Sequence, residues 1–92
     1  MKIIIAGAGD VGSHLATMLS GEQHDITLID TRQDKLKEIA LNLNLATYNA
    51  SITSIDTLNQ VGISTADLFI SVTNSEEANI TASILAKKIR CT

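Results

Sequence analysis

The chain is poor in residues on which several classes of protein depend. It has no proline and no tryptophan, one phenylalanine and one tyrosine, and a formal net charge of −3. A nucleic-acid-binding surface needs a basic face for the phosphates and aromatic side chains that stack on bases. The composition therefore argues against nucleic acid as a partner.

Signals for membranes and for secretion are missing as well. The apolar runs fall far short of the about 20 residues that cross a bilayer. Met1 and Lys2 lead directly into a β-rich segment, so we expect no signal peptide and no direct membrane insertion. The single cysteine, Cys91, cannot form an internal disulfide, which favours a reducing cytoplasm.

What the sequence does contain is a regular alternation of strands and helices. Apolar segments typical of strands occur four times, and a helical pattern follows each of them. The four predicted strands are residues 3–6, 25–30, 45–49 and 67–72. This alternation implies right-handed crossovers and a parallel sheet. We therefore predict an α/β, Rossmann-like, doubly wound parallel sheet that is truncated after the fourth β-α unit.

The domain organisation follows from the same count. Ninety-two residues make one small domain at most, with no internal boundary. A sheet of this type usually has more strands, about six in the dinucleotide-binding form. We expect residues 1–92 to be one nucleotide-binding domain and a fragment of a longer protein. A natural four-unit domain is the alternative.

The ends of the helices carry further signals. Thr31 can cap the second helix, and Asn74 with Glu77 three residues later is typical of a helix start. In the first helix, Leu15 and Met18 recur at helical spacing, and we expect Met18 in the core.

A glycine motif stands between the first strand and the first helix. Three glycines at this position mark a nucleotide site, because backbone amides at the helix start face the phosphates. Gly7 allows the tight turn, Gly9 lets the backbone approach a diphosphate, and Gly12 lets the helix pack closely. We assign only a backbone contact to the acid inside the turn. The predicted contacts are Gly7, Ala8, Gly9, Asp10, Val11 and Gly12.

Asp30, 18 residues after Gly12, strengthens this interpretation. A carboxylate at the end of the second strand can accept hydrogen bonds from both ribose hydroxyls of an adenosine and repels a 2′-phosphate. This favours NAD(H) over NADP(H). Arg32 has three possible roles: it lies along the adenine, reaches a phosphate, or is an ordinary solvated side chain. Thr31 and Arg32 join Asp30 as predicted contacts.

Two other strand ends supply small polar groups. Thr73 and Asn74 follow the fourth strand, where ligands of doubly wound folds bind, although both also suit helix capping. Ala50 and Ser51 follow the third strand and fit either an adenine pocket or an ordinary turn. No residue pattern indicates a catalytic group or a metal ligand.

With these features the chain resembles the N-terminal nucleotide-binding domain of the TrkA family, also called KTN or RCK domains. The resemblance covers the whole chain, and its matching segments are residues 2–12, 25–31, 62–67 and 71–79. The last is the most specific, with Val72-Thr73, two small polar residues, two acids and then Asn79. One departure is Asn49-Ala50-Ser51, which stands where the family usually has Gly-Asp and a small residue.

The resemblance implies a regulatory rather than an enzymatic role. It implies a cytoplasmic, nucleotide-sensing subunit of a bacterial potassium uptake system, peripheral to the inner membrane through its transport partner. NAD(H), or alternatively ATP, ADP or AMP, would bind and gate K⁺ uptake through a conformational change. The implied partners are a membrane potassium-translocating subunit and further copies of the chain, as a dimer or higher homo-oligomer.

Two other functions stay open at this point. The chain could be the cofactor-binding domain of an NAD-dependent dehydrogenase separated from its catalytic domain. It could also be a degenerate Rossmann domain used only for oligomerisation. The segment from Val72 to Asn79 favours nucleotide sensing over both.

Overall fold

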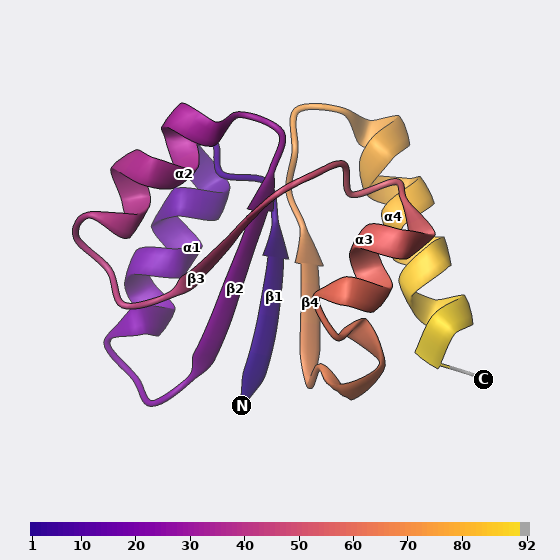
Figure 1. The fold of residues 1–92 in the computed structure, drawn as a ribbon, viewed down its shortest axis with the longest axis horizontal. Coiled ribbons are helices and arrows are strands. Elements are labelled where there is room, and N and C mark those ends of the chain that lie inside the picture. Colours follow the sequence, from indigo (N-terminus) through magenta and orange to yellow (C-terminus); the bar gives the residue numbers. More distant parts are fainter. Residues whose placement is uncertain (91–92) are drawn as a thin grey trace.

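The fold is described by a computed structural model that covers residues 1–90 (Figure 1). Strands and helices alternate from one end to the other. The elements are β1 (Lys2–Ala6), α1 (Asp10–Ser20), β2 (Asp25–Asp30), α2 (Gln33–Ala40), β3 (Ala46–Asn49), α3 (Ile55–Gln60), the 3₁₀ helix η1 (Ile63–Thr65), β4 (Leu68–Ser71) and α4 (Glu76–Arg90). Cys91, for which we expected no disulfide, lies outside the described residues.

The four strands form one parallel sheet in the order β3-β2-β1-β4. The chain therefore winds outward from β1 through β2 to β3 and returns to the other side of β1 for β4. Ala6 is in register with Ile29 of β2 and with Ser71 of β4, so these strands end at the same edge of the sheet. The predicted Rossmann-like parallel sheet is confirmed, and its strand order reverses beside β1.

Two layers of helices cover the sheet. Figure 1 shows α1 and α2 on one face and α3 and α4 on the other. Alternate residues of a strand point to opposite faces, and in β1 both sets are apolar. Ile3 and Ile5 pack in the core beside α1 and α2, whereas Ile4 and Ala6 pack in the core beside α3 and α4. A central strand that is buried on both faces explains the continuous apolar run at the start of the chain.

Helix α1 contacts the sheet through its smallest residues. Gly12 and Ala16 are its buried positions, and Leu15 and Leu19 lie partly buried beside them. The prediction that Met18 belongs to the core is wrong, because 61% of that residue is exposed. The helix approaches so closely that large side chains fit only along its flanks.

Two predicted helix caps are also corrected. Thr31 does not cap α2: the N-cap position is Arg32, with no side-chain cap hydrogen bond. At the start of α4 the cap falls one residue later than Asn74. The Ser75 hydroxyl accepts a hydrogen bond from the Ala78 N–H, three residues along the chain, at 3.1 Å.

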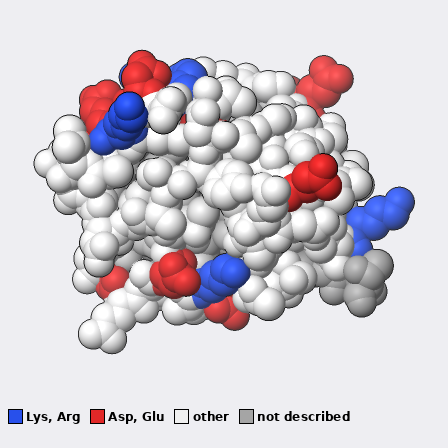
Figure 2. All heavy atoms as spheres, viewed as in Figure 1, with Lys and Arg blue, Asp and Glu red and all other residues white. Residues whose placement is uncertain are grey.

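The face of the molecule that Figure 2 shows is sparsely charged. Figure 2 shows acidic and basic side chains mixed near the rim of the face in view, with no basic patch on that face. Among residues 1–90, no helix combines the length and the apolar character needed to cross a membrane.

Candidate functional site

The glycine turn between β1 and α1 is shaped by two glycines that the fold itself requires. Gly7 has φ +117°, and a Cβ there would lie 2.9 Å from the Val72 carbonyl carbon and oxygen. A Cβ on Gly12 would lie 1.7 Å from the Gly7 oxygen. The predicted tight turn and close helix packing are both present, because neither position has room for a side chain.

Gly9 differs from these two glycines. Its backbone is extended, with φ −76° and ψ −161°, which other residues adopt readily. The nearest atom to a Cβ built on it is a guanidinium nitrogen of Arg32 at 3.8 Å, an ordinary contact. Nothing in residues 1–90 therefore requires glycine at this position, and the backbone presents an open face at the start of α1.

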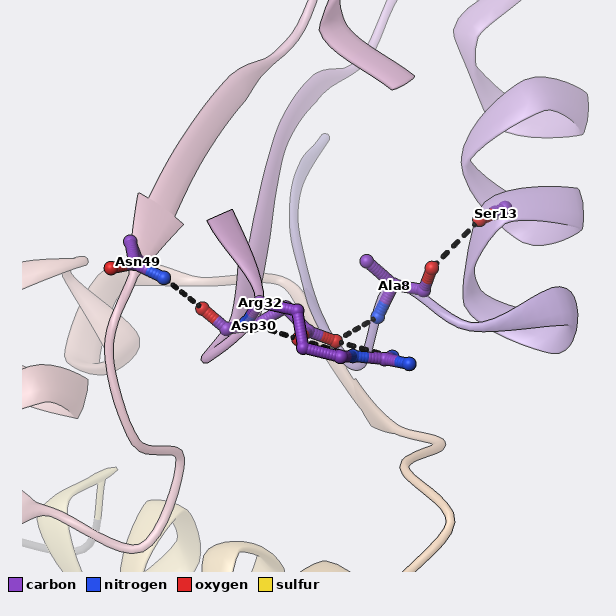
Figure 3. Close-up of polar contacts among 5 residues, drawn as sticks. All are labelled: Ala8, Ser13, Asp30, Arg32 and Asn49. Atoms are coloured by element: carbon purple, nitrogen blue, oxygen red, sulfur yellow. Dashed lines mark hydrogen bonds and ion pairs between the residues drawn. The ribbon is translucent and has the colours of Figure 1, made fainter. Parts of the chain in front are cut away.

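Two short hydrogen bonds fasten the turn to β2, and the first runs from the Gly7 N–H to the Ile29 carbonyl at 2.8 Å. The Ala8 N–H donates to Asp30 Oδ2 at 2.7 Å, and the Ser13 hydroxyl donates to the Ala8 carbonyl at 3.0 Å (Figure 3). Ser13 was missed from the sequence because a serine inside a helix gives no signal of a contact five residues back. These bonds fix the turn beside the Asp30 carboxylate.

The Asp30 carboxylate is buried and fully engaged. It receives the Ala8 N–H, the Arg32 N–H at 2.7 Å, and two guanidinium N–H groups of Arg32 at 3.0 Å each (Figure 3). Burial by itself would raise the pKa of Asp30. The hydrogen bonds from the Arg32 side chain and from the two backbone N–H groups outweigh burial and lower the pKa to about 2. The group is therefore a carboxylate at neutral pH.

Arg32 lies back across Asp30 and is not free in solvent. Its guanidinium binds both carboxylate oxygens, yet 45% of the side chain stays exposed, against 7% for Asp30. The hydrogen bond to Asp30 raises the pKa of Arg32. Of the three roles left open by the sequence, none included this pairing, because residues i and i+2 give no pattern that predicts a side-chain contact.

The end of β4 holds a compact polar network around Asn79. Its side-chain oxygen accepts hydrogen bonds from the Ser71 hydroxyl at 3.0 Å and from the Thr73 N–H at 2.9 Å. Its side-chain nitrogen donates to the Thr73 carbonyl at 3.0 Å. Asn79 stood in the motif used for the family resemblance, but the sequence did not indicate that it clamps the loop before α4.

The end of β3 contacts the same edge through its backbone and one amide. The Ala50 N–H and the Asn49 side-chain nitrogen both donate to the Asp30 carbonyl at 3.1 Å. The Asn49 side chain therefore adds a second hydrogen bond to the carbonyl that the Ala50 N–H already binds. Ala50 and Ser51 continue past this point into the adjoining hollow.

The predicted contacts divide between two hollows, each of about 400 Å³. One lies between α1 and α2 and includes Ala8, Gly9 and Asp10 in its wall. The other lies where β2, β3 and β4 end. The predicted residues in its wall are Asp30, Thr31, Arg32, Ala50, Ser51, Thr73 and Asn74.

Three predicted contacts fall outside both walls. Gly7 and Gly12 act through the shape of the turn, and Val11 is 59% exposed in the first turn of α1. The structure thus gathers the residues that follow β2, β3 and β4 around one hollow. The residues of the glycine motif do not line that hollow, and three of them line the other one. Arg32 lies between the two groups, since it reaches both the second hollow and the space over Gly9.

Neither histidine of the chain lines either hollow. Within the part of the chain that the structure describes, no three His, Cys, Asp or Glu residues gather as metal ligands would. His24 hydrogen-bonds to Glu22 in an exposed turn, and His14 is exposed on α1. The contacts that the structure shows at the edge are hydrogen bonds and the ion pair between Asp30 and Arg32.

Comparison with known proteins agrees with this arrangement of glycine turn, strand-end carboxylate and β4 loop. The family model described as the TrkA-N domain matches residues 3–92. The chain belongs to the TrkA-N domain family. TrkA-N domains are Rossmann-type nucleotide-binding domains, and the resemblance noted from the motifs is confirmed.

Named relatives of this TrkA-N chain are potassium uptake proteins. It is 43% identical over 82 residues to the Trk system potassium uptake protein TrkA of Vibrio alginolyticus and 44% identical over 82 residues to that of Halomonas elongata. Each match covers 89% of this chain and 18% of the relative. A TrkA homolog of Methanothermobacter thermautotrophicus is 35% identical over 88 residues, which is 96% of this chain and 41% of the relative. The chain thus spans less than half of these relatives.

Proposed function

We propose that residues 1–92 form a single domain that binds an adenine nucleotide, with NAD(H) as the first candidate and ATP, ADP or AMP as alternatives. One observation carries this proposal. The fold does not require a glycine at position 9, where the backbone presents an open face. This face lies next to the Asp30 carboxylate at the end of β2. A glycine that the chain itself does not require is explained by a ligand that approaches the backbone.

Different residues of the chain would contact the diphosphate, the ribose and the adenine of such a ligand. Backbone N–H groups at the start of α1 would face the diphosphate, where the helix dipole favours negative charge. Asp30 would accept the ribose hydroxyls. Ala50 and Ser51 line the hollow that suits an adenine, and Thr73 and Asn74 line the same hollow from the β4 loop. Its volume of about 400 Å³ lies within the range of small-ligand pockets.

The domain would act as a regulatory sensor and not as an enzyme. The named relatives belong to Trk potassium uptake systems, so the effector we propose is a membrane potassium-translocating subunit. Copies of the chain would associate with one another as a homo-oligomer. This homo-oligomer would lie in the cytoplasm, peripheral to the membrane. Control of K⁺ uptake requires only that the nucleotide bind one conformation better than another, by about 1–3 kcal/mol of coupling.

Alanine at Gly9 tests the observation that carries the proposal. Gly9→Ala should leave the thermal unfolding temperature within about 2 °C of the parent, since the added methyl meets only an ordinary contact. Nucleotide affinity should fall about tenfold or more, because the methyl blocks the backbone from the diphosphate. Calorimetric titration with NADH, NAD⁺, ATP, ADP and AMP measures the affinity, and circular dichroism measures the unfolding.

Gly21→Ala is the matched control. Gly21 also has open space around it, with Met18 O at 3.7 Å from a built Cβ, but it lies at the other end of α1. This variant should keep both the fold and the affinity. Failure of every nucleotide to bind a folded parent would refute the proposed site, as would an unchanged affinity in Gly9→Ala.

A further inference from the structure

The contacts of Asp30 follow a simple rule: each carboxylate oxygen takes one backbone donor and one guanidinium donor. Oδ1 receives the Arg32 N–H and Nε, and Oδ2 receives the Ala8 N–H and a terminal guanidinium nitrogen of Arg32. The backbone donors are held by the turn and by the start of α2. The guanidinium donors belong to a side chain that is 45% exposed and can leave.

The guanidinium fills the positions that a ribose would need. It offers two parallel N–H donors to the two oxygens of a carboxylate. A ribose with free vicinal hydroxyls offers two O–H donors to the same two oxygens. Asp30 cannot hold both sets, because its backbone bonds already use one direction on each oxygen. A ribose therefore reaches Asp30 only by displacing the Arg32 side chain.

The displaced guanidinium has a second place to bind nearby. Its terminal nitrogen already lies 3.8 Å from a Cβ position on Gly9, beside the open face of the turn. A diphosphate held at that face would lie within reach of a cation that remains tethered two residues from Asp30. Arginine pairs with phosphate as well as with carboxylate.

We propose that Arg32 sets the ligand specificity of this site by changing partners, from Asp30 in the absence of nucleotide to the diphosphate in its presence. This inference rests on the proposed function and adds a selection rule to it. A ligand must supply both vicinal hydroxyls, which replace the guanidinium on Asp30, and a diphosphate, which receives the guanidinium. Adenosine supplies only the first, so it breaks the Arg32–Asp30 pair without offering Arg32 a new partner. ADP and NAD⁺ supply both.

Removal of the guanidinium should therefore shift two affinities in opposite directions. In Arg32→Met, which keeps an apolar stem, adenosine should bind about threefold tighter because it no longer competes with the guanidinium. ADP and NAD⁺ should bind about fivefold weaker because the diphosphate loses a cation, and the loss should shrink at high salt. Isothermal titration of the purified protein with adenosine, ADP and NAD⁺ measures all three.

A direct readout comes from the Arg32 side chain in the parent protein. The Nε–H that donates to Asp30 should give a slowly exchanging signal in ¹⁵N NMR. Adenosine should shift or broaden that signal as the pair breaks, whereas ADP should move it to a new, sharp position. Neither change follows if Arg32 only stabilises the fold.

Lys35→Met is the control for a general effect of positive charge. Lys35 is exposed on α2 and lines the hollow that includes Gly9, but it makes no bond to Asp30 in the described structure. The Lys35→Met variant should change the affinities for phosphate ligands slightly and should not change the affinity for adenosine. The partner exchange is refuted if the parent binds ADP and Arg32→Met changes the affinities for adenosine and for ADP in the same direction. It is also refuted if the parent binds ADP and the substitution changes neither affinity. If a folded parent binds neither ADP nor NAD⁺, the proposed function itself fails.

Discussion

The ends of β2 and β4 lie at the same edge of the sheet, and the polar side chains there find their hydrogen-bond partners in opposite ways. The end of β2 carries a buried charge, Asp30, whose partners come from a distant turn and from an exposed arginine. The end of β4 carries a neutral network in which Asn79 closes on Ser71 and Thr73, at most eight residues away. The first arrangement has a partner that can be replaced, and the second has none.

This difference suits the end of β2 to binding a ligand and the end of β4 to holding the loop before α4 in shape. A charge whose partner is exposed can exchange that partner for a ligand at small cost. A closed neutral network loses hydrogen bonds if any member turns away, and buried polar groups left without partners are costly. We therefore expect the β4 loop to hold its shape while the Arg32 side chain moves.

The largest effect is expected from breaking the β4 network. Asn79→Ala removes the acceptor of Ser71 and Thr73 and the donor to the Thr73 carbonyl, so it should cost about 2–3 kcal/mol of unfolding free energy. Urea unfolding followed by circular dichroism measures the change.

Asn79→Asp is the matched variant for this network. It keeps the accepting oxygen, but it replaces the donating nitrogen with an oxygen that faces the Thr73 carbonyl and it adds a negative charge. A smaller loss than that of alanine would show that the accepted hydrogen bonds outweigh this repulsion, and an equal or larger loss would show that they do not.

A smaller effect is expected from acid at the β2 end. Because the folded-state pKa of Asp30 is lowered from 3.8 to about 2, its contribution to stability is complete above about pH 4. It is lost as the pH falls through about 2. The contribution should be about 1–2 kcal/mol, reduced by the exposure of Arg32 to solvent.

Unfolding free energies at pH 6 and pH 2.5 in the parent and in Asp30→Asn measure this contribution. The variant should start less stable and lose less on acidification. An identical pH dependence in both proteins would show that the Arg32 pair does not stabilise the fold.

The smallest effect separates the two helix starts that follow these strands. Ser75→Ala removes the hydroxyl that accepts the Ala78 N–H and should cost about 1 kcal/mol. Thr31→Ala should change stability by less than about 0.5 kcal/mol, because the Thr31 side chain does not cap α2. Thermal unfolding measures the loss in each variant against the parent, and a loss of about 1 kcal/mol in Thr31→Ala would show that Thr31 caps α2.

The fold was predictable because its signals are local or periodic. The apolar run that begins at Ile3 and the glycines at 7 and 12 predict a buried strand, a turn and a close helix, and each is present. Met18 was misplaced because helical spacing marks a face without marking how near the sheet comes. The distance was set by Gly12 and Ala16, which bring the helix axis too close for a large side chain.

The sequence by itself determined that the sheet is parallel and that Asp30 stands at the end of its second strand. The parallel sheet follows from the alternation of strand and helix periods and from the handedness of parallel crossovers, which any chain with this pattern shares. The order β3-β2-β1-β4 comes from the tertiary structure. Only the tertiary structure decided that Arg32 covers Asp30, that Gly9 is free of contacts the fold needs, and that Asn79 closes the β4 loop. Those outcomes depend on side-chain rotamers and on distances between segments far apart in the chain, and no spacing in a sequence encodes them.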